Sequence, residues 1–463
     1  MVGYVKEALL AAILVTGLGA LGLEVPATAA EAGRFTAVSD IHFDPFGDDA
    51  AVRALAAAPP ADWPALLAGL PPVPASQYGR DTNRTLLASA LAAIAAAGAE
   101  ADFAIVSGDL LSHGFEDDAA RVLGAGAASG LAQRTSLFVA EAVAGTHPGK
   151  PVILALGNND SGCGDYEIEP GGAYLAALGE TVKRLAGPNR VAADFDATWR
   201  AGGYYAVAHP TVAGTLILVL NDVLWSTRYQ DACGADGLAA GRAQMDWLSA
   251  TLAAEAEAGG RVWLVHHIPW GIDAYSTLHA KGESCAGRVV PFMKAEFAEA
   301  FASAIRSHAA RIDISLSGHI HTDDYRLLFD AAGKPVAADK IVPAISPIYG
   351  QNPAFQVFTY DRGSGAPTDF ATIALANLPD LGPADGRWAE SYAFGRAYGL
   401  PGYATEAVAS LWNGLGQGGR IRDAYVANYN AGHGALPEAD LDAYACAIGF
   451  LDPSVYAACY CGE

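Results

Sequence analysis

Two histidines that stand two residues apart, His319 and His321, are the residues in this chain whose types and spacing most directly suggest chemistry. They follow residues 312–316, where apolar residues alternate in the manner of a strand. Because residues two apart project to the same side of an extended chain, both imidazoles can reach one point or two neighbouring points. Gly318 lets another backbone or a ligand approach closely. A histidine pair alone is a weak indication of a metal site.

Four other strand-like runs also end in side chains that can bind metals. Those at 35–39, 103–107, 152–156 and 262–265 are followed by Asp40 and His42, Asp109, Asn158, and His267. In open α/β sheets, ligands gather at the carboxyl ends of the strands. Each residue alone has an ordinary explanation as a turn residue or a packed histidine. Their recurrence after successive strands favours one shared site.

The donor set predicts the kind of metal and the kind of reaction. Nitrogen and oxygen ligands without a thiolate suit Zn²⁺, Fe, Mn²⁺ or Co²⁺. Two such ions held about 3.5–4 Å apart can activate a water and stabilise both ends of an in-line displacement at phosphorus. A carboxylate must then bridge them, and we assign that role to Asp109. We therefore expect two divalent ions as cofactors, with Zn as the first expectation and Fe or Mn as alternatives.

In chain order, Asp-x-His, Gly-Asp, Gly-Asn, His and Gly-His-x-His resemble the calcineurin-like metallophosphoesterase superfamily. The closer similarity is to acid sphingomyelinase and its phosphodiesterase relatives. It is carried by His267-Ile268-Pro269, Gly203-Tyr204-Tyr205, Asn221 through Trp225, and the spacing from Asp109 to His113. The resemblance covers roughly residues 34–375. It implies an α/β fold, a β-sandwich of the four-layer metallophosphoesterase type flanked by helices.

The resemblance also implies roles for individual residues. One metal would be held by Asp40, His42, Asp109 and His321, and the other by Asp109, Asn158, His267 and His319. His113 matches the family's proton donor to the leaving group, a task suited to a side chain that titrates near neutrality. Neighbours on a strand face opposite ways, so only one of His266 and His267 can face the metals. The His-Ile-Pro match selects His267 and leaves His266 packed behind it. The candidate catalytic residues are His113, Asn159 and His319.

Some positions depart from the family pattern and leave the substrate open. Asn159 stands where acid sphingomyelinase-like enzymes usually have a histidine, and an amide is no acid near neutral pH. His113 would then act alone, or Asn159 would hydrogen-bond a phosphoryl oxygen. The Gly-Asn-Asn-Asp form also resembles endopolyphosphatases. Ser112 replaces the tyrosine that ligates iron in purple acid phosphatases, which argues against that class.

The expected function is an exported dinuclear-metal phosphodiesterase that hydrolyses phosphate esters by metal-bound hydroxide. Its expected substrate is a small phosphate ester or a phospholipid-derived molecule. The alternatives are an endopolyphosphatase or a nucleotide phosphomonoesterase of the same superfamily, and, less expected, a non-catalytic metal-binding protein. The 463 residues carry a net charge of −22, which opposes binding to a nucleic-acid scaffold or to an anionic membrane.

The N-terminus resembles a secretory signal. Lys6 is followed by an apolar run from Ala8 to Leu23 and small residues up to Ala30. We expect cleavage after Ala29 or Ala30, a secreted or periplasmic protein, and no stable membrane insertion after cleavage; a retained membrane anchor is the alternative. We divide the chain into a signal peptide at 1–30, a catalytic domain at 31–379, and a helical C-terminal subdomain at 380–463.

Six cysteines in an exported chain predict disulfides rather than a structural zinc site. We pair Cys446 with Cys459 and Cys233 with Cys285. Among the connecting segments, 45–77 is expected to be a surface loop or a cap next to the site, 84–97 a helix, and 117–143 a helical stretch interrupted by glycines. Runs 204–207 and 216–220 are expected to pair as a hairpin, and 242–258 to be a helix.

Overall fold

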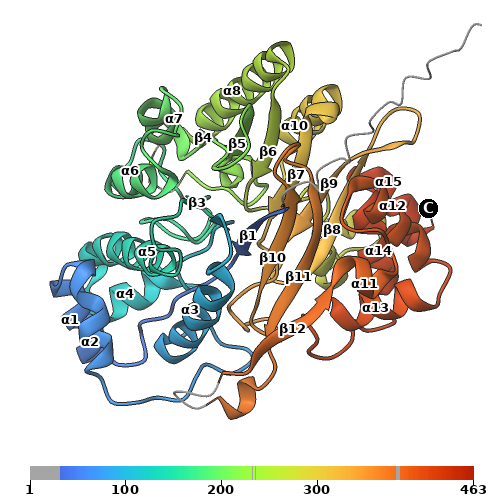
Figure 1. The fold of residues 1–463 in the computed structure, drawn as a ribbon. Helices are drawn as coiled ribbons and strands as arrows, with labels where there is room; N and C mark the ends of the chain where they lie inside the picture. Colours follow the sequence, from blue (N-terminus) through green and yellow to red (C-terminus); the bar gives the residue numbers. More distant parts are fainter. Residues whose placement is uncertain (1–31, 232, 235, 382–385, 463) are drawn as a thin grey trace, which may run out of the picture. The chain divides into compact units, whose positions relative to one another are not determined.

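Two mixed β-sheets of six strands each form the centre of the protein (Figure 1). The computed structural model describes residues 32–231, 233–234, 236–381 and 386–462, and the signal peptide expected at 1–30 lies outside them. The first sheet has the order β12-β11-β10-β1-β2-β3 and the second β4-β5-β6-β7-β9-β8.

In the first sheet, β1, β2 and β3 run parallel, while β10 pairs antiparallel with β1 and continues through antiparallel β11 and β12. The strand bounds are β1 Ala32–Val38, β2 Phe103–Val106, β3 Val152–Leu154, β10 Ala354–Asp361, β11 Pro367–Leu375 and β12 Trp388–Ala393. Three parallel neighbours place their carboxyl ends at one edge of the sheet, which is the edge where ligands are expected to gather.

In the second sheet, β5, β6, β7 and β9 run parallel, and antiparallel β4 and β8 form its two edges. The bounds are β4 Tyr205–Ala208, β5 Thr215–Val219, β6 Arg261–Val265, β7 Ile312–Ser317, β8 Asp324–Phe329 and β9 Pro335–Ile341. The hairpin expected from 204–207 and 216–220 is confirmed by the antiparallel pairing of β4 with β5.

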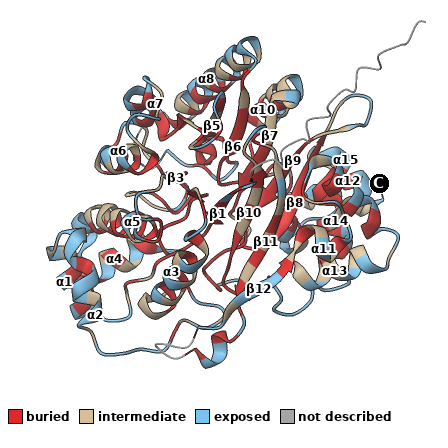
Figure 2. Cartoon of the chain, viewed as in Figure 1, coloured by how far each residue is buried: buried red, intermediate tan, exposed pale blue. Residues whose placement is uncertain are grey.

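Aromatic side chains join the two sheets into a sandwich. The ring of Phe35 on β1 lies 5.2 Å from Phe103 on β2 and 5.1 Å from Trp263 on β6, and Trp263 meets Tyr360 on β10 edge-on at 5.6 Å. All four rings are buried. Large apolar surfaces removed from water in this way supply most of the stability of such a core. Figure 2 shows most strands of the two sheets as buried, whereas the edge strand β12 is largely exposed.

Helices cover the sandwich. α3 contacts β1, α5 and α6 contact β3, α8 contacts β6, and α10, α12 and α14 contact β8 or β9. The α-helices are α1 Asp49–Ala57, α2 Trp63–Ala68, α3 Arg84–Gly98, α4 Phe115–Leu123, α5 Ala128–Gly145, α6 Ala173–Ala186, α7 Phe195–Gly202, α8 Gly237–Ala258, α9 Ala274–His279, α10 Ala295–His308, α11 Phe394–Tyr398, α12 Thr405–Leu415, α13 Arg420–Asn428, α14 Leu441–Gly449 and α15 Pro453–Cys461. Two sheets flanked by helices confirm the predicted α/β fold.

The expectation of a loop at 45–77 was wrong, because this segment contains α1 and α2. Asp48 caps α1 by accepting from the backbone N–H of Ala50, and apolar residues at helical spacing, Val52 and Leu55, are fully buried. The density of alanine and proline in this stretch masked that spacing. The helices expected at 84–97 and 242–258 are confirmed, with small shifts of their ends.

All six cysteines are paired, as Cys163–Cys233, Cys285–Cys461 and Cys446–Cys459. The Cys446–Cys459 prediction is confirmed, and the Cys233–Cys285 prediction is wrong. Cys233 lies instead beside the loop after β3, a neighbour far away in the sequence. Among the described residues, none of the helices is long and apolar enough to cross a membrane.

Candidate dinuclear metal centre

The predicted ligands converge where β1, β2 and β3 of one sheet and β6 and β7 of the other end. Beyond the strands the chain continues in register, since the backbone N–H of Asp40 donates to Gly108 at 3.0 Å and that of His42 donates to Asp109 at 3.0 Å. Between the neighbouring strands β6 and β7 of the second sheet, the N–H of Gly318 donates to the carbonyl of His267 at 2.8 Å, and across the sandwich the N–H of His319 donates to Oδ2 of Asp40 at 3.0 Å. These bonds bring loops from both sheets to one point.

Asp40, His42, Asp109 and His321 form one half of the cluster. The Nε2 atoms of His42 and His321 lie 3.1 Å apart. Nε2 of His42 lies 3.3 Å from Oδ2 of Asp109, and Nε2 of His321 lies 3.5 Å from Oδ1 of Asp40. All four side chains are buried.

Asp109, Asn158, His267 and His319 form the other half. Nε2 of His267 lies 3.2 Å from Oδ2 of Asp109 and 3.0 Å from Oδ1 of Asn158. Asp109, His267 and His319 offer ligand atoms within 4.8 Å of one another. The same Oδ2 of Asp109 therefore faces histidines of both halves, which is the position of a bridging carboxylate.

The hydrogen bonds that His42 and His267 make through Nδ1, on the side of each ring away from the cluster, are those expected for metal-binding histidines. Nδ1 of His42 lies 2.8 Å from the carbonyl of Leu111, and Nδ1 of His267 lies 2.8 Å from the carbonyl of Ser107. Each carbonyl must accept, so the proton sits on Nδ1 and the lone pair of Nε2 points into the cluster. Acceptor atoms that face one another need a positive charge between them, so this donor set suits a pair of divalent ions.

Asn158 and His319 are oriented from a loop that the sequence did not single out. The amide nitrogen of Asn158 donates to Asp165 at 2.6 Å, which turns its Oδ1 toward His267. The hydroxyl of Tyr166 lies 3.2 Å from Nε2 of His319, so Nδ1 is the atom that His319 can offer to a cation.

Two buried carboxylates hold the ligand loops without facing the cluster. Asp160 accepts from the backbone N–H of Asp109 at 2.8 Å, of Leu110 at 2.8 Å and of Gly157 at 2.9 Å. Asp222 accepts from the N–H groups of His267 and Ile268 and from Nδ1 of His266. Sequence reasoning missed both, although Asp160 and Asp222 lie inside quoted motifs.

His266 is packed away from the cluster, as predicted. Its ring lies between Asp222, at 2.9 Å, and Asp339, at 3.2 Å, and is fully buried. Burial opposes its charge, but attraction to Asp339 and Asp222 raises its pKa to about 10. His266 therefore carries a buried positive charge that ties β6 to its neighbours.

The ligands sit on strained backbone. Asp40, His42, Asp109, His319 and His321 all adopt positive φ, between 46° and 70°. This left-handed conformation is unfavourable for residues with a side chain and collects at functional sites. A Cβ on Gly318 would lie 1.9 Å from Oγ of Ser39, so the predicted close approach at this glycine is confirmed.

The charges of the cluster depend on one another. Burial opposes the charged forms of His42 and His267, yet attraction to Asp109 raises the pKa of His42 to about 9 and that of His267 to about 10. Burial lowers the pKa of His319 and of His321 to about 3. Without an ion, protons on His42 and His267 balance the carboxylates, and a cation would displace them.

Comparison with known protein families identifies the family of this chain. Residues 33–323 match the model of the calcineurin-like phosphoesterase family. The chain belongs to that family. It is therefore a metal-dependent phosphoester hydrolase, and within the family its similarity is to acid sphingomyelinase-like phosphodiesterases, as its motifs predicted.

Three relatives illustrate this similarity. The phosphoesterase is 27% identical to acid sphingomyelinase-like phosphodiesterase 3b of Homo sapiens, over 93% of this chain and 90% of the relative. It is 27% identical to sphingomyelinase phosphodiesterase D of Dictyostelium discoideum, over 70% and 67%. It is 24% identical to cyclic GMP-AMP phosphodiesterase SMPDL3A of Mus musculus, over 87% and 86%.

His113 and Asn159 lie beside the ligands of the phosphoesterase. The ring of His113 stacks on that of His42 with centroids 4.2 Å apart. Asn159 donates from its backbone N–H to Oδ1 of Asp109 at 2.8 Å and from its amide to Oδ2 at 3.0 Å. Asn159 thus fixes the orientation of the Asp109 carboxylate.

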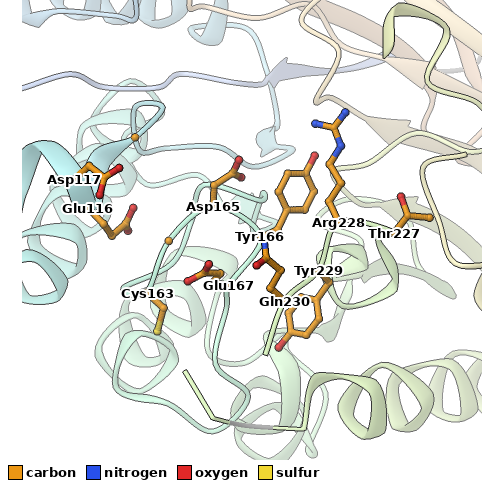
Figure 3. Close-up of a pocket in the computed structure, with 12 residues that line it drawn as sticks. Glu116, Asp117, Cys163, Asp165, Tyr166, Glu167, Thr227, Arg228, Tyr229 and Gln230 are labelled. Carbon is orange, nitrogen blue, oxygen red and sulfur yellow. The ribbon is translucent and has the colours of Figure 1, made fainter. Parts of the chain in front are cut away.

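Two cavities lie beside the segments that carry or orient the candidate ligands. One of about 710 Å³ is shown in Figure 3, where Glu116 and Asp117 face Asp165, Tyr166 and Glu167 across a hollow. The other, of about 510 Å³, reaches His319 and is lined on one side by Tyr275, Phe292 and Tyr349. Residues 429–444 of the C-terminal segment line its other side. Of these two cavities, only the second has a candidate ligand in its lining, so a substrate seated at the candidate metal centre would extend into that cavity.

Proposed function

We propose that this protein is an exported phosphodiesterase that uses two divalent metal ions to hydrolyse small phosphate diesters. One ion would be held by Asp40, His42, Asp109 and His321, and the other by Asp109, Asn158, His267 and His319. The observation that supports the proposal most directly is the convergence of imidazole nitrogens and amide and carboxylate oxygens from five strand ends, with Oδ2 of Asp109 between the two halves.

Two bound cations would supply Lewis-acid activation of a water and of the phosphoryl oxygens. The chain's own residues prepare the site for that chemistry. Asp160 and Asn159 fix Asp109, and Leu111 and Ser107 set the tautomers of two histidines. His113, on the rim, would donate a proton to the leaving oxygen. Zn is the ion we expect first, with Fe and Mn as alternatives.

The relatives guide the choice of substrate. Their names all describe phosphodiesterases but differ in the substrate, which is sphingomyelin in one group and cyclic GMP-AMP in another. A diester of a small phosphorylated molecule is therefore the substrate class that we propose. The net charge of −22 disfavours an extended polyanion such as a nucleic acid.

Export is supported by the cysteines. Three disulfides form and persist in oxidising compartments, such as the cell exterior or the bacterial periplasm. N-terminal sequencing of protein recovered from the medium or periplasm tests this part of the proposal. A first residue near Ala30 is expected, and a chain retained in the cytoplasm with Met1 intact would contradict it.

The metal assignment is tested by Asp109→Asn, measured on purified protein whose metal content has been determined. The amide removes the bridging charge, so turnover of bis-p-nitrophenyl phosphate should fall by about a thousandfold or more, because several kcal/mol of charge stabilisation are lost. Asp246→Asn, an exposed acid on α8, is the matched control. An Asp109→Asn protein that is active and holds two metals per chain refutes the assignment.

The proposed substrate class is tested by comparing hydrolysis of a panel of phosphate esters. Bis-p-nitrophenyl phosphate, p-nitrophenyl phosphate, long-chain polyphosphate, sphingomyelin and cyclic GMP-AMP should be compared at equal metal loading. We expect diesters to be hydrolysed at least tenfold faster than the monoester or polyphosphate. Faster hydrolysis of polyphosphate would support an endopolyphosphatase instead, and no turnover of any ester would support a metal-binding protein.

A further inference from the structure

Asp81 is a buried carboxylate that touches the candidate proton donor. It lies in the loop before α3 and is only 7% exposed. It accepts from the backbone N–H of His113 at 2.8 Å, and its two oxygens lie 3.1 Å from Nδ1 of the same residue. None of the ligand sets described above includes it.

Asp81 is itself held rigidly. Oγ of Ser346, in the loop after β9, donates to Asp81 at 2.8 Å. The next residue, Thr82, donates its N–H to the carbonyl of His42 at 3.1 Å. Asp81 therefore joins three loops that surround the metal centre, and its carboxylate has a fixed place relative to His42.

These contacts fix which nitrogen of His113 faces the substrate. The carboxylate of Asp81 can only accept, so Nδ1 of His113 must carry its proton toward Asp81. The proton that remains for donation is the one on Nε2. The stack of His113 on His42 keeps the ring at the rim of the cluster, where a leaving group would depart.

We propose that Asp81 is a positioning residue that orients His113 and fixes its tautomer for proton donation to the leaving group. This inference rests on the proposed function, in which His113 is the acid. It adds a residue that the ligand motifs do not contain. A buried carboxylate behind an imidazole selects one tautomer and one ring orientation, and both effects serve a general acid.

The proposed hydrolysis of the diester conserves atoms, electrons and protons. The bond between phosphorus and the leaving oxygen breaks, and its electron pair stays on that oxygen. The proton on Nε2 of His113 moves to the same oxygen, which departs as the alcohol. Water supplies the new oxygen on phosphorus, and a proton released from that water returns His113 to its charged form. Asp81 keeps the Nδ1 proton throughout and exchanges none.

The same contacts are also compatible with a different role for His113, that of a metal ligand. His42, His113 and His321 together offer nitrogens within 4.8 Å of one another, so His113 could also bind a metal. In that case Asp81 would orient a ligand rather than an acid, and its loss would release metal. Metal content and leaving-group dependence separate these two roles.

The test compares Asp81→Asn, His113→Gln and the double variant on diesters of one alcohol with ring-substituted phenols. A general acid matters most when the leaving phenolate is basic, so kcat of His113→Gln should fall by about a hundredfold or more for phenol and only a few-fold for p-nitrophenol. Asp81→Asn should show the same trend with a smaller loss, about tenfold for phenol. The double variant should be no worse than His113→Gln, and two metals per chain should remain.

Each contrary result has a distinct meaning. If His113→Gln loses activity equally on all phenols, the acid assignment within the proposed function fails. If His113→Gln shows the trend and folded Asp81→Asn does not, only the inference about Asp81 fails. Loss of metal from Asp81→Asn also overturns it. Asp81→Ser provides a second variant if Asp81→Asn does not fold, and Asp246→Asn controls for the removal of a carboxylate.

Discussion

The ligand residues of this phosphoesterase depend on side chains that do not face the metal cluster. Asp160 shows this most clearly, because three backbone N–H groups around Asp109 and Gly157 donate to it at 2.8–2.9 Å. Its carboxylate is fully buried. Without it, the strained turn that carries Asp109 would lose the acceptors that hold it in place.

Replacing Asp160 with Ala should therefore damage both folding and metal binding. Unsatisfied buried N–H groups each carry a desolvation penalty, so we expect the free energy of unfolding to fall by about 3–5 kcal/mol. Urea denaturation and metal analysis measure the two effects. Asp160→Asn retains one acceptor oxygen and should lose less. An Asp160→Ala protein that keeps its stability and both metals would contradict the role given to Asp160.

At this scale, the sequence singled out candidate ligands that the structure brings together, but not the side chains that hold them in place. Metal-binding side chains just after strands have a recognisable spacing, and the structure brings Asp40, Asp109 and His267 together. A supporting carboxylate such as Asp160 has the same sequence appearance as an ordinary turn residue. Only the three-dimensional path of the neighbouring backbone reveals which N–H groups it accepts from.

Among the elements, the loop after β3 has the largest influence on the cluster. It carries Asp165, which orients Asn158, and Tyr166, which contacts His319. The disulfide from Cys163 to Cys233 ties this loop to the segment before α8. The disulfide thus stabilises a loop that orients two candidate ligands of the same metal.

Removing that disulfide should affect one metal more than the other. For Cys163→Ser with Cys233→Ser, we expect stability to fall by about 2–4 kcal/mol and one of two metals to bind at least tenfold more weakly. Metal titration by calorimetry measures the second effect. The matched control is Cys446→Ser with Cys459→Ser, whose disulfide lies in the C-terminal helices and should leave metal affinity unchanged. Equal metal loss in both pairs would refute the specific role of the loop.

Most strands of the sandwich could be predicted, but β8, β9 and β12 were not. β8 and β9 carry charged residues that the sequence pattern assigns to a surface. In the structure these charges are buried in pairs, Arg326 with Asp324 at 2.6 Å and Lys340 with Asp323 at 2.6 Å. Lys340 on β9 reaches its partner just before β8, and Asp324 also accepts from Tyr425 far later in the chain, so a local apolar pattern carries no sign of this burial.

At the scale of the whole molecule, the segment after residue 380 contributes to the sheets as well as covering them. Its first strand, β12, extends the first sheet by pairing with β11. The hydroxyl of Tyr392 donates to Asp323 and that of Tyr425 donates to Asp324, both at 2.8 Å. Residues of this segment also line the cavity that reaches His319. The segment therefore both extends the first sheet and forms part of the wall of the cavity beside His319.

Global stability should fall in acid partly because of two histidines outside the metal centre, His147 and His209. Burial lowers the pKa of each to about 4, with Lys150 contributing at His147 and Arg190, opposed by Asp102, at His209. The unfolded chain, whose histidines have a pKa near 6.5, binds more protons between these values, so the free energy of unfolding decreases as pH falls from about 6.5 to about 4.

Each histidine should contribute roughly 2 kcal/mol to this loss after allowance for partial solvation. His147→Gln and His209→Gln should each flatten the dependence of unfolding free energy on pH, measured by urea denaturation from pH 7.5 to 4. Metal release adds an acid-dependent loss of its own, but it is common to wild type and variants and cancels in their difference. If the slopes of His147→Gln and His209→Gln both equal the wild-type slope, these two histidines take up protons equally in the folded and unfolded states, which contradicts the prediction.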